Sequence, residues 1–244
     1  MPVTVEPVYC IDKERRSLEI ERAAMSKILA ALQAKPETKA NFLPVKQIDI
    51  DTLPENQDIT DAYKTICKTV RLGSQYEWLA KTALTYPGIE TGNEKPNGEF
   101  SGCSAAIDQF GKLIHVNDTW KIDPEKSSPE LRLLFENISF PIIMTTELEM
   151  RQNIHDWGYD DVMSNIWFCY TPINGKPCGK CRPCEQKMEC GMEWLLPPEA
   201  HKRYKLHKKF EAALKIPVIG FGLRAVRKIY RLSRKLYRKI FTSR

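Results

Sequence analysis

Hydrophobic and polar residues follow two periods along the chain, one typical of helices and one typical of strands. Residues 15–34 place apolar side chains on one face at steps of three and four residues, which predicts a helix. The apolar runs at residues 4–11 and 45–50 flank this helix, and each has the length of a buried strand. The first third of the chain is therefore expected to form a strand, a helix and a second strand.

The same pattern predicts further elements in the rest of the body. They are helices over residues 59–70, 75–84 and 131–138 and strands over residues 89–92 and 140–144. Thr146 and Glu149 have the spacing of a capping box, so another helix is expected to begin there and to reach about Trp157. Strands that alternate with helices indicate an α/β fold built on a mainly parallel sheet.

Charge divides the chain into a mildly acidic body and a strongly basic tail. Residues 201–244 hold 15 Lys/Arg and one acidic residue, whereas residues 1–200 hold 22 Lys/Arg and 30 Asp/Glu. Within the tail, residues 223–241 repeat apolar positions between the basic ones, which predicts an amphipathic helix. For residues 217–244 three roles remain open: binding to an anionic membrane surface, docking on the chain's own body, or binding to nucleic-acid phosphates.

Composition limits the compartment and the number of domains. The 244 residues are 42 % hydrophobic, which is enough for a packed core, and contain no apolar run of membrane-spanning length. The first residues lack the pattern of a secretory signal, so a cytoplasmic protein is expected, with a peripheral position at the inner membrane face left open. We expect an α/β domain over residues 1–166, a metal-binding segment over 167–200 and the basic helical tail over 201–244.

Four of the eight cysteines form a compact motif with the spacing C-x8-C-x2-C-x2-C. They are Cys169, Cys178, Cys181 and Cys184. Tight C-x2-C turns can direct thiolates toward one ion, so this spacing predicts a Zn²⁺ site, with buried thiols or two disulfides as the alternative. Because four sulfurs close the coordination sphere, the predicted metal is structural. Cys10, Cys67, Cys103 and Cys190 are interpreted as small core residues.

Signals for catalysis are weak in comparison. The first glycine is Gly73 and no two glycines are adjacent, so no conventional phosphate-binding loop is predicted. No Ser/His/Asp or Cys/His set can be assigned, and the catalytic residues therefore stay unknown. His115 and His155 are more typical of surface or core histidines. The carboxylates that fall in loop-like stretches are interpreted as solvated; they are Asp108, Asp118 and Asp123.

Residues 169–184 read Cys-Tyr-x-Pro-x-x-Gly-x-x-Cys-Gly-x-Cys-x-x-Cys, which resembles the C-terminal zinc site of the 7-cyano-7-deazaguanine synthases. Residues 141–149, followed by Gly158, are similar to a strand and helix start of that family, with Glu147 in place of its lysine. Residues 8–23 are similar to the family's second strand and the helix after it. Arg71 and Gly73 lie where the family has a Gly-Arg-Asn segment, which makes them the candidate cofactor-binding residues.

The resemblance covers about residues 5–195 and implies an adenine-nucleotide alpha-hydrolase-like (HUP, PP-loop) parallel-sheet sandwich with a C-terminal zinc knuckle. It also implies an ATP-dependent C–N ligase that converts 7-carboxy-7-deazaguanine to the nitrile, with ATP as cofactor and a purine-like ligand. The family's Ser-Gly-Gly-x-Asp-Ser loop has no counterpart in this sequence. The missing strand is expected to lie upstream or to come from a second subunit or a homodimer. Alternatively, the chain is a non-catalytic binding or adaptor protein.

Overall fold

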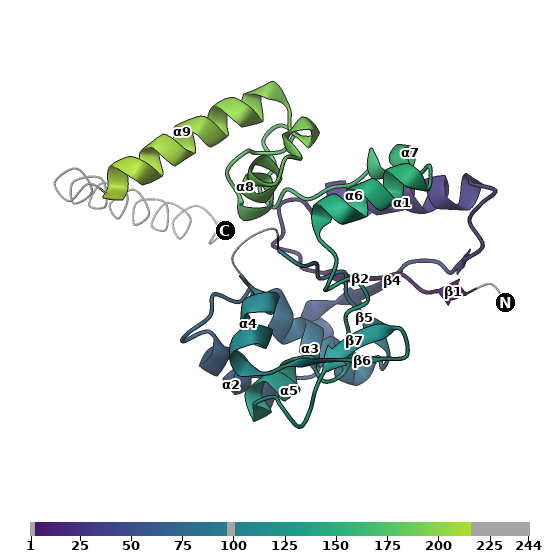
Figure 1. Cartoon of the computed structure of the whole chain (residues 1–244), viewed down its shortest axis with the longest axis vertical. Helices are drawn as coiled ribbons and strands as arrows, with labels where there is room; N and C mark the ends of the chain where they lie inside the picture. The colour runs from purple at the N-terminus through teal and green to yellow at the C-terminus, as the bar shows by residue number, and fades with distance from the viewer. Residues whose placement is uncertain (1–2, 97–100, 216–244) are drawn as a thin grey trace, which may run out of the picture. The chain divides into compact units, whose positions relative to one another are not determined.

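The computed structural model describes residues 3–96 and 101–215 (Figure 1). The chain divides into two compact units. The first unit is Met1–Trp167 and the second is Phe168–Arg244. The basic helix predicted over residues 223–241 lies outside the described residues. No described helix is both long enough and apolar enough to cross a membrane.

The first unit begins with parallel strand pairs joined by a helix. Strand β2 (Val8–Ile11) pairs in parallel with β4 (Lys46–Asp49), and α1 (Leu18–Ala34) connects them. The single strand expected over residues 4–11 is wrong in one respect, because β1 (Thr4–Val5) is separate and pairs with β3 (Asn41–Phe42). Pro7 lies between β1 and β2, and proline has no N–H to donate to a continuous ladder.

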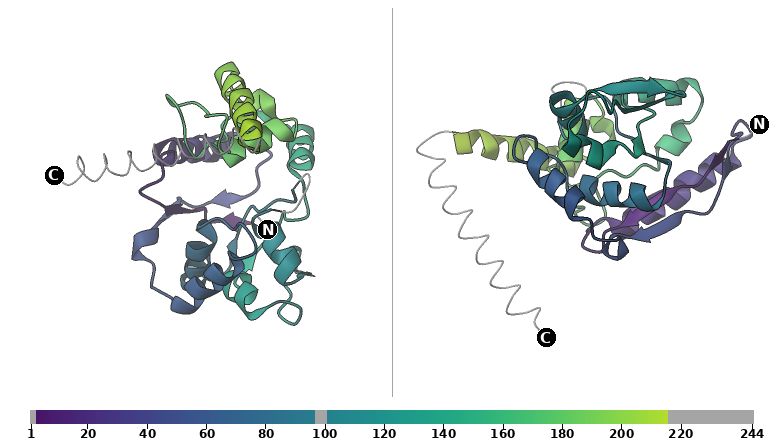
Figure 2. Two further views of the ribbon diagram at one scale, coloured as in Figure 1. Left: turned by 90° about the vertical axis from the view of Figure 1, so that its left-hand side faces the viewer. Right: turned by 90° about the horizontal axis from the view of Figure 1, so that it is seen from below.

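Four helices enclose the main hydrophobic core of this unit. They are α2 (Gln57–Ile66), α3 (Gln75–Thr85), α4 (Cys103–Phe110) and α5 (Pro129–Phe135). Ile66, Phe135 and Phe140 are completely buried, and the ring of Phe135 meets those of Tyr76 and Phe140 edge to face. The helices of residues 57–135 lie together in both further views (Figure 2). This core is formed within residues 59–143, where α2 and α5 pack against each other.

Two of the expected boundaries near this core are wrong. The helix predicted over residues 131–138 ends at Phe135, and β8 (Ile138–Ser139) follows it and pairs in parallel with β5 (Ile89–Glu90). The strand predicted over residues 140–144 is a pair of turns instead, closed by bonds from Ile143 N to Phe140 O and from Thr145 N to Ile142 O. Pro141 accounts for part of this difference, since it cannot donate to a sheet.

A hairpin that the sequence pattern did not predict covers residues 113–122. Strands β6 (Leu113–Val116) and β7 (Thr119–Ile122) pair antiparallel. The turn residues Asn117 and Asp118 have φ of 48° and 61°, which is the geometry of the two-residue hairpin turns that Asn and Asp tolerate. Asp108 lies in α4, so its expected loop position is wrong.

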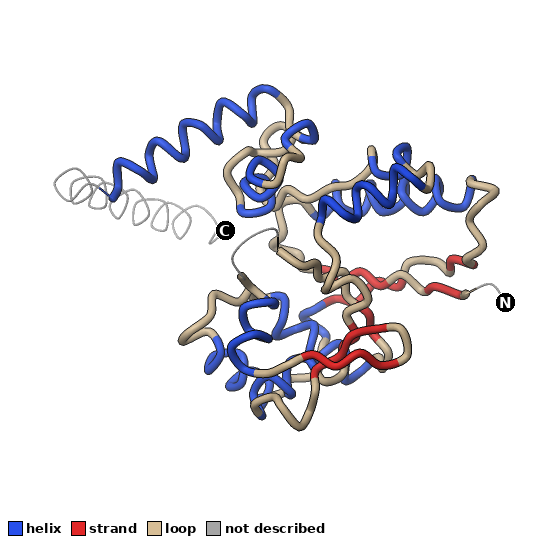
Figure 3. Tube along the Cα trace, viewed as in Figure 1, coloured by secondary structure: helices blue, strands red, loops and turns tan. Residues whose placement is uncertain are grey.

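The predicted capping box is confirmed. Helix α6 (Glu147–Asp156) begins with the Thr146 hydroxyl accepting from the Glu149 N–H, while the Glu149 carboxylate accepts from the Thr146 N–H. A short helix, α7 (Asp160–Met163), follows and packs against α1. Within the described residues the strands form four separate two-stranded sheets, three of them parallel, so the chain is mixed α/β (Figure 3).

The second unit contains a loop followed by helices. The loop carries the first three cysteines of the motif, and α8 (Arg182–Glu189) carries the fourth. A short 3-10 helix, η2 (Glu193–Leu195), leads to α9 (Pro198–Lys215), which contains the first basic residues of the tail. The described part of the tail thus belongs to the same compact unit as the cysteine motif.

Candidate metal centre

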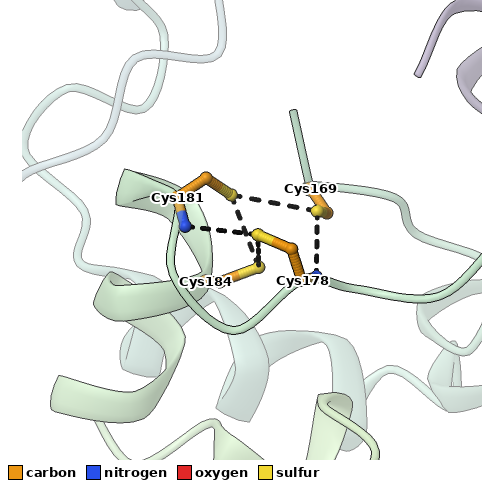
Figure 4. A group of neighbouring side chains, drawn as sticks. All are labelled: Cys169, Cys178, Cys181 and Cys184. Atoms are coloured by element: carbon orange, nitrogen blue, oxygen red, sulfur yellow. Dashed lines mark hydrogen bonds between the residues drawn. The ribbon is translucent and has the colours of Figure 1, made fainter. Parts of the chain in front are cut away.

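The four motif cysteines converge on one point of the second unit (Figure 4). Their Sγ atoms all lie within 4.8 Å of one another. Cys169, Cys178 and Cys184 are buried and Cys181 is half-buried. The structure therefore brings together every residue that the sequence predicted as a metal ligand, in a group that could hold a metal ion.

The distances between the sulfurs fit a tetrahedral zinc site. The Sγ atom of Cys181 lies 3.8 Å from that of Cys169 and 3.5 Å from that of Cys184, and the Cys178 and Cys184 sulfurs are 3.9 Å apart. A tetrahedron with zinc–sulfur distances of about 2.3 Å has edges of about 3.8 Å. A disulfide would require about 2.05 Å. All four cysteines are free, so the alternative of two disulfides does not describe this structure.

Backbone N–H groups point at the sulfurs as they do around bound thiolates. Cys178 N donates to Cys169 Sγ at 3.2 Å, and Lys180 N and Cys181 N donate to Cys178 Sγ at 3.4 and 3.3 Å. The Thr171 hydroxyl adds a bond of 3.3 Å to the same sulfur. These donors stabilise negative charge on Cys169 and Cys178, which is the charge that a metal-bound cysteine carries.

Because the four sulfurs lie close together, the pKa values of two cysteines are lowered and those of the other two are raised. Side-chain hydrogen bonds with Cys169 first, and then with Cys181 and Cys184, lower the pKa of Cys178. The thiol of Cys169 is likewise the main cause that lowers the pKa of Cys181, to about 6. Side-chain hydrogen bonds raise the pKa values of Cys169 and Cys184, the one with Cys178 contributing most at Cys169 and the one with Cys169 contributing most at Cys184. A divalent cation would replace these shared protons, since its charge offsets the repulsion among four thiolates.

Gly179 allows the knuckle between Cys178 and Cys181 to approach α9. Its φ is +75°, and a Cβ atom at this position would lie 2.1 Å from the carbonyl oxygen of Ala200. Ala200 itself is completely buried. Both the backbone conformation and the close approach therefore require glycine at this position.

Arg203 holds α9 on the same knuckle. Its guanidinium donates from Nε to the carbonyl of Cys178 at 2.8 Å and from Nη2 to the carbonyl of Pro177 at 3.0 Å. Reasoning from the sequence missed this residue, because nothing in its local pattern distinguishes it from the other basic residues of the tail. The centre therefore includes the first turns of α9 as well as the cysteine motif.

The other candidate residues lie elsewhere in the first unit. Arg71 and Gly73 are in the connection between α2 and α3, where Arg71 is exposed and Gly73 O accepts from Tyr76 N. Their role in cofactor binding stays a prediction. His115 packs its ring on Trp120 with 5.0 Å between centroids, and His155 Nδ1 lies 2.8 Å from a carboxylate oxygen of Asp160.

The fold and the site together define a mixed α/β chain with a four-cysteine group positioned to hold a metal ion, consistent with zinc. No protein-family model, no curated protein and no solved structure matches the chain.

Proposed function

We propose that the chain is a zinc-dependent binding protein, in which the four-cysteine site fixes helix α9 so that its outer face contacts an anionic membrane surface. The observation that carries this proposal is the pair of hydrogen bonds from Arg203 to the carbonyls of Pro177 and Cys178. These bonds link the position of α9 to the loop that the metal organises. Zinc then has a structural role, as a closed set of four sulfurs suggests.

The residues of α9 that are exposed support a membrane contact. Lys202, Lys205 and Lys209 are exposed, and the neighbouring side chains of Leu206 and Phe210 are 70 % and 38 % exposed. Steps of three and four residues place all five on one side of the helix, while Ala200 and Arg203 lie toward the knuckle. Lysines that flank exposed apolar side chains are the pattern of a helix at a lipid interface. Each lysine near an anionic surface contributes about 1 kcal/mol.

Two sets of substitutions in the full chain separate a membrane partner from a nucleic-acid partner. The charge variant is Lys202→Glu, Lys205→Glu and Lys209→Glu, and the apolar variant is Leu206→Ser and Phe210→Ser. If α9 contacts a membrane, less of either variant than of the wild-type chain should cosediment with phosphatidylserine vesicles. If the partner is a nucleic acid, only the charge variant should bind nucleic acid more weakly, because the contact with phosphates depends on the lysine charges and not on the apolar side chains.

A matched control changes the same net charge on the first unit. Lys68, Lys112 and Lys121 are exposed there, and their replacement by Glu should leave vesicle binding nearly unchanged. Removal of zinc by a chelator before mixing should weaken binding, because α9 loses its support. Binding that is insensitive to both zinc and the α9 variants would overturn the proposal.

A second candidate function is the ATP-dependent ligase that the family resemblance implies, on an HUP-type sheet. Two observations favour it: the parallel β2–α1–β4 unit and an apolar cavity of about 580 Å³ between α1 and the α6–α7 region. Tyr159 and Trp157 line this cavity and offer aromatic faces to a purine-like ligand. The phosphate-binding unit would come from a second subunit or a second copy of the chain.

The test of the ligase is AMP release from ATP, measured with 7-carboxy-7-deazaguanine and ammonium present. Release that depends on the deazaguanine would support the ligase. Absence of release from the zinc-loaded chain, both alone and with its co-purifying partners, would count against it. Vesicle binding is independent of this result, so the two functions can fail separately.

A further inference from the structure

A second group of metal-ligating side chains lies between α8 and α9. It consists of Glu185 from α8 and of His207 and Glu211 from α9, and one ligand atom of each lies within 4.8 Å of the others. The four-residue step from His207 to Glu211 puts both on the same face of α9. This group shares no residue with the four-cysteine site, although Glu185 directly follows Cys184 in the sequence.

One carboxylate oxygen of Glu185 is buried without a hydrogen-bond donor. Its side chain is only 13 % exposed, and its Oε1 atom is shielded from solvent with no hydrogen-bond partner. A buried carboxylate oxygen in this situation costs free energy unless a cation lies beside it. The ammonium group of Lys208 on α9 pairs with Glu189 instead, at 2.9 Å.

The distances around His207 suit a shared metal ion better than direct hydrogen bonds. His207 Nε2 lies 3.4 Å from Glu185 Oε1 and 3.5 Å from Glu211 Oε1. A charged hydrogen bond between these atoms would be about 2.7–2.9 Å long. By contrast, nitrogen and oxygen ligands about 2.1 Å from a tetrahedral metal are separated by about 3.4 Å.

We propose that Glu185, His207 and Glu211 form a second site for a divalent metal ion of the zinc type. One imidazole nitrogen and two carboxylate oxygens are ligands that Zn²⁺ accepts, whereas Mg²⁺ and Ca²⁺ prefer oxygen alone. Three protein ligands leave a coordination position open to water, unlike the closed four-cysteine site. An ion in this site would pair with the Glu185 oxygen and join α8 to α9 at a second point, independently of the function proposed above.

The test is the number of zinc ions held by the full chain, measured by native mass spectrometry with Zn²⁺ as the only added ligand. The wild-type chain should hold two. His207→Ala and Glu211→Gln should each hold one, and zinc affinity at the second site should fall at least tenfold. His115→Ala removes an exposed histidine from the first unit and should still hold two.

Cobalt substitution shows which site is lost. Cobalt in the four-cysteine site gives intense thiolate charge-transfer bands, and these bands should persist in His207→Ala and Glu211→Gln. Their persistence also reports that the second unit is folded in each variant. A wild-type chain that holds one zinc ion in excess Zn²⁺, or variants that still hold two, would overturn the proposal and leave Glu185 and His207 as an ion pair between helices.

Discussion

Replacement of Gly179 by alanine tests whether α9 is part of the metal centre. The new Cβ atom would lie 2.1 Å from the Ala200 carbonyl oxygen. Neither atom can move away by a side-chain rotation, because the carbonyl oxygen is part of the backbone and the backbone fixes the position of a Cβ atom. The knuckle and the start of α9 must therefore separate. We expect weaker zinc binding in the variant, because the separated loop no longer holds the four sulfurs at their spacing.

Gly175 provides a matched control in the same loop. Its φ of +71° is close to the +75° of Gly179, but a Cβ atom at Gly175 would have no heavy atom within 4 Å. Gly175→Ala therefore carries only the strain of a left-handed backbone, about 1–2 kcal/mol. Gly179→Ala carries the same strain and an overpacking cost of about 1–3 kcal/mol. The difference between the two variants isolates the contact with α9.

Zinc affinity is the quantity to measure, because a chain with two compact units does not guarantee two-state unfolding. Competition with a chromophoric chelator gives the affinity of each variant. A difference of 1–3 kcal/mol corresponds to an affinity about 5 to 150 times lower for Gly179→Ala than for Gly175→Ala. Equal affinities in the two variants would refute the inferred contact between the knuckle and α9.

Three other changes have definite expected outcomes. Cys181→Ser should remove zinc from the four-cysteine site and unfold the second unit, as measured by metal content and limited proteolysis. Arg203→Ala should lower zinc affinity about tenfold or more, because two bonds from a charged donor are lost, each worth about 1.5–3 kcal/mol. Thr146→Ala should lower the free energy of unfolding of the first unit by about 0.5–2 kcal/mol in chemical denaturation, since the cap of α6 is removed. Hydrogen bonds from the N–H and then from the hydroxyl of Thr146 lower the pKa of Glu149 below its usual 4.5. The ionised Glu149 therefore stabilises the fold above about pH 4.5, and this stabilisation is lost as the pH falls through the lowered pKa.

Each of these outcomes has a result that contradicts it. A Cys181→Ser chain with full zinc content and unchanged protease resistance would argue against the four-cysteine site. Unchanged zinc affinity in Arg203→Ala would mean that the bonds to the knuckle carbonyls do not support the metal. A Thr146→Ala chain whose free energy of unfolding matches that of the wild type would show that the Thr146 hydroxyl does not stabilise the start of α6.

Features that depend on neighbours a few residues apart followed from the sequence. The apolar spacing of α1, the capping box of α6 and the C-x2-C steps of the cysteine motif all act within one or two turns of chain. Two of the differences from the predicted elements follow from local rules. Pro7 divides a strand, and Asn117 and Asp118 close a hairpin that the apolar pattern alone did not indicate.

Only the tertiary structure showed what surrounds the metal ligands. Gly179 and Ala200 approach each other, Arg203 reaches the knuckle carbonyls, and Glu185 faces His207, although each pair is separated by about twenty residues or more. Such contacts depend on how α8, η2 and α9 turn relative to one another, and no local period of the sequence encodes that direction. The sequence by itself therefore determined the four sulfur ligands, because their spacing is local. Their support by a basic helix was decided by packing.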